Sequence, residues 1–160
     1  MKILGIDPGI ARCGYAVIEQ HKNQIKLLES GCITTKPGVE AERLVEIKKD
    51  LESIIKRLKP DCACIESLFF AQNVKTAMTV GQARGVIMVT LAEHHLKIIE
   101  VTPLQVKIAA TGYGKADKSQ DMRMVMKLLN LKKIPTPDDA ADACAIAWAG
   151  IGRIKLASLK

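Results

Sequence analysis

The order of strand-like and helical segments along this chain limits the folds that it can adopt. Three short strand-like runs come first; after them, helical stripes with apolar residues three or four positions apart alternate with two more strand-like runs. The predicted strands cover residues 2–7, 14–20, 25–35, 61–66 and 97–101, and the predicted helices cover residues 40–58, 73–94, 103–110, 118–129 and 137–152. We therefore expect an α/β fold in which a five-stranded mixed sheet carries helices on both faces.

The length and charge of the chain narrow its function. Its 160 residues fit one domain that spans residues 1–160, and no repeat or linker divides them. Lys and Arg number 24 against 17 Asp and Glu, which gives a net charge of +7 and predicts a polyanionic partner such as nucleic acid. With one Trp, two Tyr and two Phe, the chain has too few aromatic residues for the base-stacking platform of a single-strand binder.

Cysteine usage and hydropathy predict a cytoplasmic protein. The five cysteines are odd in number and form no C-x-x-C pair, which argues against a disulfide framework and a zinc site. We expect them to be reduced. The apolar run before Asp7 is too short for a signal peptide, and no run approaches the roughly 18 apolar residues of a membrane span, so no membrane association is expected.

Carboxylates stand at the ends of two predicted strands and at the start of the last helix. Asp7 ends the first strand and Glu66 ends the fourth, so both emerge at one sheet edge if these strands are parallel neighbours. Asp139 and Asp142 are three positions apart, on one face of the last helix, where their repulsion requires a compensating cation. Asp138 also shares a face with Asp142, so helical spacing leaves Asp138 and Asp139 as alternatives.

Converging carboxylates without His or Cys nearby are hard oxygen ligands, suited to Mg²⁺ or Mn²⁺. Two such ions, about 4 Å apart, activate water and stabilise the leaving oxygen of a phosphodiester. An acidic metal pocket in a basic protein favours a nuclease. Some of these acids also have a structural alternative: Asp7 suits the turn before Pro8, and Asp138 and Asp139 suit the first turn of a helix that Thr136 caps and Pro137 begins. Such an explanation is weak for Glu66, which ends a buried strand, and for Asp142, which lies beyond the first turn.

Short motifs follow one another along nearly the whole chain. They are Gly5-Ile6-Asp7-Pro8-Gly9 with Gly14-Tyr15, Ile65-Glu66 with Phe69, Gly81-Gln82-Ala83-Arg84-Gly85, and Asp139-Ala140-Ala141-Asp142-Ala143. In this order they resemble the RuvC family of Holliday-junction resolvases. The resemblance implies a ribonuclease-H-like fold with catalytic, metal-binding acids at Asp7, Glu66, Asp139 and Asp142, which leaves Asp138 as a capping neighbour. It also implies an Mg²⁺-dependent homodimer, with two ions per subunit and Mn²⁺ as a substitute, that nicks a four-way junction symmetrically.

The same resemblance suggests residues that contact DNA. Phe69 matches a loop aromatic that meets unstacked bases, and Lys107 and Lys118 match basic positions that contact DNA backbone. Lys115 and Arg84 are further predicted DNA-binding residues. Products with 5′-phosphate and 3′-hydroxyl ends, and the RuvA and RuvB branch-migration proteins as partners, are implied by the family alone. Gly81 and Gly85 follow Ala77 at four-residue steps on the long helix, where they suit either close packing on the sheet or a dimer contact.

Two other functions share some of these features. An actin-like or sugar-kinase ATPase has a similar D-x-G strand and turn, but it needs two lobes around its nucleotide, and this chain has room for one. A junction-binding module without catalysis would keep the basic surface, but it would not need all four acids. The sequence therefore favours the nuclease.

Overall fold

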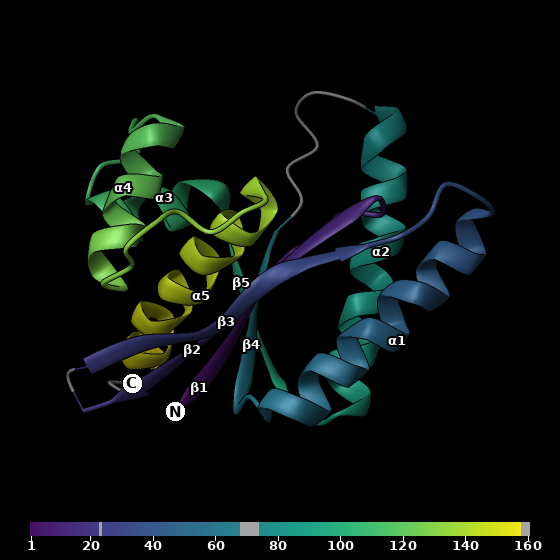
Figure 1. Cartoon of the computed structure of the whole chain (residues 1–160), viewed down its shortest axis with the longest axis horizontal. Helices are drawn as coiled ribbons and strands as arrows, with labels where there is room; N and C mark the ends of the chain where they lie inside the picture. The colour runs from purple at the N-terminus through teal and green to yellow at the C-terminus, as the bar shows by residue number, and fades with distance from the viewer. Residues whose placement is uncertain (23, 68–73, 158–160) are drawn as a thin grey trace.

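The computed structural model describes residues 1–22, 24–67 and 74–157, and it confirms the predicted order of elements (Figure 1). The strands are β1 (Lys2–Asp7), β2 (Arg12–His21), β3 (Gln24–Thr34), β4 (Cys62–Glu66) and β5 (Lys97–Val101). The helices are α1 (Glu40–Leu58), α2 (Val74–Glu93), α3 (Pro103–Thr111), α4 (Lys118–Leu128) and α5 (Asp138–Ala157). No helix among these residues is long and apolar enough to cross a bilayer.

The strands form one five-stranded mixed sheet in the order β3-β2-β1-β4-β5. The first three strands are an antiparallel meander, whereas β4 runs parallel to both β1 and β5. The central strand β1 is buried on both faces, so it is nearly continuously apolar rather than alternating. This topology places β1 and β4 side by side, with their carboxyl ends at one edge.

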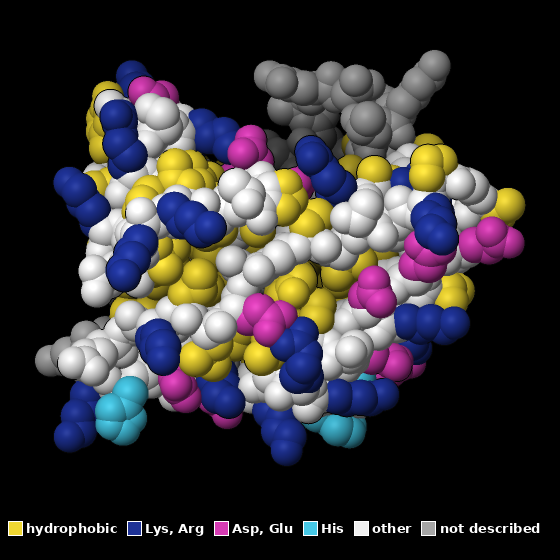
Figure 2. Space-filling model, viewed as in Figure 1, with side chains coloured by type: hydrophobic (Ala, Val, Ile, Leu, Met, Phe, Trp, Pro, Cys, Tyr) yellow, Lys and Arg dark blue, Asp and Glu magenta, His cyan; other side chains and the backbone are white. Residues whose placement is uncertain are grey.

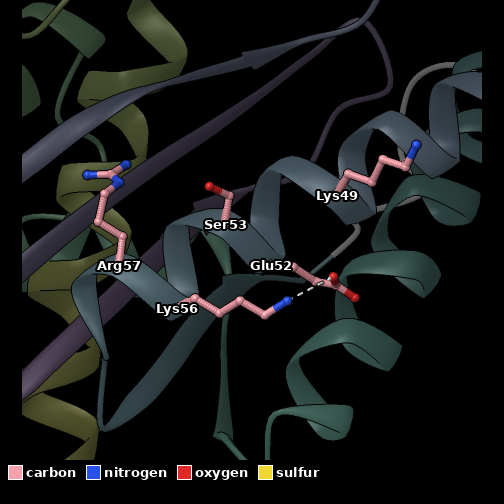
Figure 3. A pocket seen from close by; sticks show the side chains of 5 residues that line it. All are labelled: Lys49, Glu52, Ser53, Lys56 and Arg57. Atoms are coloured by element: carbon pink, nitrogen blue, oxygen red, sulfur yellow. Dashed lines mark ion pairs between the residues drawn. The ribbon is translucent and has the colours of Figure 1, made fainter.

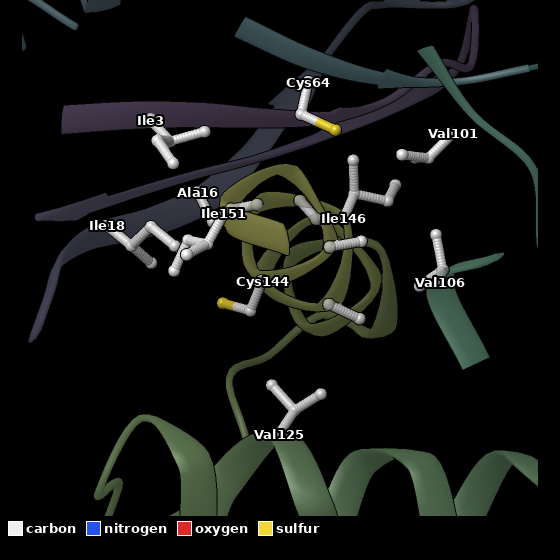
Figure 4. Packing of buried hydrophobic residues seen from close by; sticks show 14 of the residues in the cluster. Ile3, Ala16, Ile18, Cys64, Val101, Val106, Val125, Cys144, Ile146 and Ile151 are labelled. Carbon is white, nitrogen blue, oxygen red and sulfur yellow. The ribbon is translucent and has the colours of Figure 1, made fainter. Parts of the chain in front are cut away.

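Helices cover both faces of the sheet, as expected, and each face has its own apolar core. The stripe of α1 buries Ile47 and Leu51 with Ile87 of α2 against one face. On the other face, α5 packs Cys144 and Ile146 beneath the sheet, and residues of α3 and α4 complete this core (Figure 4). The N-terminal part of α5 is thereby held against the central strands.

The start and end of α5 differ from the sequence prediction. Pro137 was expected as the first helical residue, but α5 begins at Asp138. The Pro137 carbonyl accepts a hydrogen bond from the Ala140 N–H at 2.9 Å, so Pro137 stands where a capping residue would. The helix also continues past Gly152 to Ala157, and Ile154 in this extension packs against the same core.

The small residues of α2 do not all face the sheet. Ala83, Ile87 and Leu91 are fully buried and form the face that packs on the sheet. Gly85 lies on another side of the helix, and a Cβ atom built there meets nothing within 4 Å. Sheet packing is therefore the wrong explanation for Gly85, and a dimer contact stays a prediction.

Candidate active site

Asp7 and Glu66 lie at the same edge of the sheet, where β1 and β4 end. The two strands are parallel, and Ile6 is the register partner of Ile65. The next residue on each strand is therefore Asp7 on β1 and Glu66 on β4. This confirms the condition on which the sequence argument depended, and it gives the two carboxylates a rigid support from neighbouring strands.

Two glycines let α5 approach the sheet closely enough to bring its own carboxylates to this edge. A Cβ atom at Gly5 would lie 2.3 Å from the carbonyl oxygen of Ala143, and one at Gly14 would lie 2.0 Å from that of Asp139. No side chain fits at either position, because real Cβ atoms do not come so close to backbone. The first turns of α5 therefore lie directly on β1 and β2, with Asp142 close to the strand ends.

A cavity of about 270 Å³ opens at this edge, with Asp7, Glu66 and Asp142 in its wall. Other polar side chains that line it are those of Lys107, Lys118 and Asp121, and its apolar wall is formed by Pro103, Val106, Ala145 and Ile146. The structure thus brings three of the four predicted acids into one pocket. Asp121 was not predicted, because an acid in the first turn of a helix has an ordinary explanation in the helix dipole.

The structure separates Asp138 from Asp139, which helical spacing could not do. The Asp138 side chain is 82% exposed, whereas the Asp139 side chain is only 20% exposed. Asp139 Oδ2 is buried and lies 3.2 Å from Arg12 Nε without forming a hydrogen bond of good geometry. Asp139 is therefore the inward-facing acid, beside the cavity rather than in its lining.

Two side chains of the protein itself supply the compensating cations. Lys118 Nζ lies 3.2 Å from Asp142 Oδ2 and 3.6 Å from Asp138 Oδ2, and Arg12 pairs with Asp139. Within the described part of the chain, no three His, Cys, Asp or Glu side chains are already arranged to hold a metal ion. The acids are thus gathered at one edge, with lysine and arginine between or beside them.

Burial and mutual repulsion raise the pKa values of these acids. Burial, followed by the charges of Glu66, Asp142 and Asp139, raises the pKa of Asp7 to about 7. Burial and the Asp142 charge raise the pKa of Glu66 to about 6. Burial also raises the pKa of Asp142, although the Lys118 hydrogen bond opposes it. Carboxylates that ionise reluctantly and offer only oxygen atoms fit a divalent cation, which would stabilise their charged forms.

These shifts predict how the stability of the metal-free protein depends on pH. Because the pKa of Asp7 is raised from 3.8 to about 7, the folded chain binds more protons than the unfolded chain between these values. The Asp7 contribution to stability is therefore complete below about pH 4 and is lost as the pH rises towards 7. In EDTA, we expect the melting temperature of Asp7→Asn to rise relative to wild type over this interval. A difference that stays constant from pH 4.5 to 7.5 would contradict the shift.

The predicted DNA-contact residues are not all in one place. Lys107 on α3 and Lys118 on α4 line the cavity, and Lys115 is exposed between these helices. Figure 2 shows Lys and Arg side chains gathered over the α3 and α4 side of the molecule. Arg84 pairs instead with Glu100 of β5, and its side chain is only 18% exposed. Phe69 lies outside the described residues. DNA binding by Phe69 and by these four basic residues stays a prediction.

A second hollow, of about 460 Å³, lies on α1 and contains none of the strand-end acids (Figure 3). Its wall includes Lys56, which pairs with Glu52 at 3.6 Å, and Arg57, which pairs with Glu29 on β3. The Glu29 carboxylate also accepts a hydrogen bond from the Tyr15 hydroxyl at 2.8 Å. The pair between Arg57 and Glu29 holds α1 to the meander, which gives the charged groups of this hollow a structural role.

Comparison with known proteins identifies the family. The family model described as "Crossover junction endodeoxyribonuclease RuvC" matches residues 3–149. The curated RuvC of Alkaliphilus oremlandii is 54% identical over 149 residues, which cover 92% of this chain and 90% of that protein. This chain belongs to the RuvC family. The RuvC resemblance that was inferred from the motifs is therefore confirmed, and the two-lobed ATPase is the wrong alternative.

Solved RuvC structures support the same assignment. The structure of Thermus thermophilus RuvC superposes with a TM-score of 0.89 at 31% identity, covering 98% of this chain and 97% of that one. The structure of T. thermophilus RuvC in complex with Holliday junction substrate gives a TM-score of 0.92, also at 31% identity, and covers 98% and 96% of the two chains. The ribonuclease-H-like fold expected for a RuvC protein is thus confirmed.

Proposed function

We propose that this RuvC-family chain, acting as one domain over residues 1–160, is an endonuclease that resolves four-way DNA junctions in recombination and repair. The observation that carries the proposal is the cavity in which Asp7, Glu66 and Asp142 meet. It occurs in a fold that superposes on T. thermophilus RuvC in complex with Holliday junction substrate, with a TM-score of 0.92. The basic balance of the chain, +7, suits a polyanionic substrate.

Asp7, Glu66 and Asp142 would hold Mg²⁺, or Mn²⁺ as a substitute, with two ions per subunit as our proposal. Asp139 would complete one ligand set or orient the attacking water. When bound, such ions help to generate the nucleophile and neutralise charge on the attacking and leaving oxygens of a phosphodiester. The raised pKa values of Asp7 and Glu66 favour this assignment, because each carboxylate gains from a cation that replaces its proton.

The side chains of the protein position the substrate in this scheme. Lys107 and Lys118 line the cavity from α3 and α4, where their ammonium groups can bind backbone phosphate. Lys118 now pairs with Asp142 and Asp138, and a phosphate would offer it another anionic partner. Lys115, Arg84 and Phe69 would be further DNA contacts. In-line attack of water would leave 5′-phosphate and 3′-hydroxyl ends.

We also propose a homodimer. A four-way junction has near two-fold symmetry, and a C2 dimer presents two identical cavities to it, one for each nick. The exposed side of α2 that carries Gly85 is a candidate for the contact between the subunits. Cooperation with RuvA and RuvB, and a cytoplasmic location, belong to the same proposal.

A labelled four-way junction tests the proposed function. With Mg²⁺, we expect paired nicks at symmetric positions in two strands of like polarity, mapped by gel electrophoresis against sequence ladders. A linear duplex of the same sequence is the control and should remain intact. A protein that binds the junction but leaves it uncut in Mg²⁺ and in Mn²⁺ would be a binding module, and the nuclease proposal would be wrong.

A further inference from the structure

Asp121 is an acid in the cavity wall that the RuvC motifs do not include. It lies in the first turn of α4, and the residue is only 7% exposed. Its Oδ1 atom is buried and has no hydrogen-bond partner among the described residues. A buried carboxylate oxygen without a partner destabilises a fold, so its presence in a cavity calls for a functional explanation.

The charged groups around Asp121 indicate which partner it serves. Lys118, one turn earlier on α4, is directed to Asp142 and Asp138. Lys107 reaches the same cavity from α3, which packs beside α4, and among the described residues it forms no ion pair within 4 Å. Burial and the Asp142 charge raise the pKa of Asp121, and the positive charge of Lys107 partly offsets this. Asp121 and Lys107 thus line the same cavity from adjacent helices, and Lys107 is the cation of this lining that no described acid pairs with.

We propose that Asp121 is a positioning residue that holds the Lys107 ammonium at the cavity, where it binds a backbone phosphate of the strand to be cut. This inference rests on the proposed function, because the DNA substrate of that function supplies the phosphate that Lys107 binds. Lysine has a flexible four-carbon stem, and a fixed anion beside it reduces the number of positions that its ammonium group occupies before DNA arrives. The buried oxygen of Asp121 is then retained for binding rather than for stability.

The proposal predicts an effect opposite in sign to simple electrostatics. An acid near a DNA backbone repels it, so removing its charge should tighten DNA binding. If Asp121 positions Lys107, an Asp121→Asn protein instead binds the junction more weakly. Because Asn carries no charge to bury, the same variant should melt at or above the temperature of the wild-type protein.

The test is a double-mutant cycle with junction affinity as its readout. Fluorescence anisotropy without divalent metal compares wild type, Asp121→Asn, Lys107→Met and the double variant at several salt concentrations. We expect each single variant to raise Kd several-fold, up to about tenfold, and the double variant to bind no more weakly than Lys107→Met. The slope of log K against log salt should become shallower by up to about 0.9, the value of one phosphate contact, in both single variants.

Asp138→Asn is the matched control, since it removes one charge at the edge of the same site from a side chain that is 82% exposed. It should bind the junction at least as tightly as wild type. The positioning role is wrong if Asp121→Asn binds as well as wild type, melts lower, or weakens binding equally in the Lys107→Met background. If Asp121→Asn also raises the Kd for Mn²⁺ in the Lys107→Met protein, Asp121 is a metal ligand instead. If wild type does not bind the junction, the proposed function fails as well.

Discussion

An Asp7→Asn protein is expected to lose junction cleavage by about a thousandfold or more while its junction affinity stays within about twofold of wild type. Such a loss corresponds to roughly 4 kcal/mol of transition-state stabilisation. Asp7 is the acid whose pKa is raised by the charges of all three of its partners, Glu66, Asp142 and Asp139. It is therefore the common neighbour of the cluster, and its carboxylate is the one that a bound cation most requires.

Single-turnover cleavage in Mg²⁺ and anisotropy without metal measure the two effects separately. Asn has the shape of Asp, so the fold should persist. Asp138→Asn is again the control, because the largely exposed Asp138 carboxylate lies at the start of α5, outside the cavity lining. It should cleave within a few-fold of the wild-type rate. Cleavage by Asp7→Asn within tenfold of wild type would disprove the proposed role of this acid.

A Gly5→Ala protein is expected to lose about 3 kcal/mol of stability or more, with most of its cleavage activity. The added methyl group would stand 2.3 Å from the Ala143 carbonyl oxygen and 2.5 Å from the Ala147 backbone nitrogen. Backbone cannot yield as a flexible side chain would, so α5 must move away from β1. This movement displaces Asp139 and Asp142, which α5 carries to the strand ends.

Thermal unfolding and single-turnover cleavage test this prediction together. For a chain of this size, a loss of 3 kcal/mol lowers the melting temperature by roughly 6–12 °C. Gly152→Ala is the matched control on the same helix, since its Cβ atom would meet nothing within 4 Å. It should stabilise the protein by about 0.5–1 kcal/mol, because alanine is the better helix former. A Gly5→Ala protein that melts with wild type would contradict the close approach.

Local sequence patterns were sufficient to predict the helices and strands and part of the candidate active site. Runs and stripes of apolar residues predicted the strands and helices, although the start of α5 was placed one residue early at Pro137. The acids Asp7 and Glu66 were identified by their places at strand ends, and parallel pairing of β1 and β4 confirmed that both lie at one edge. Metal binding by Asp7 and Glu66 stays a prediction.

The sequence by itself determined the order of elements, the family motifs and the acids at the strand ends, because each depends on neighbours in the chain. Tertiary structure decided that Asp139 rather than Asp138 turns inward, that Lys118 pairs with Asp142, and that Asp121 is buried in the wall of the cavity that Lys107 also lines. Spacing along a helix fixes the direction in which a side chain leaves the helix axis. Which neighbour fills that side depends on packing between distant segments, here on the two glycines that bring α5 onto the sheet.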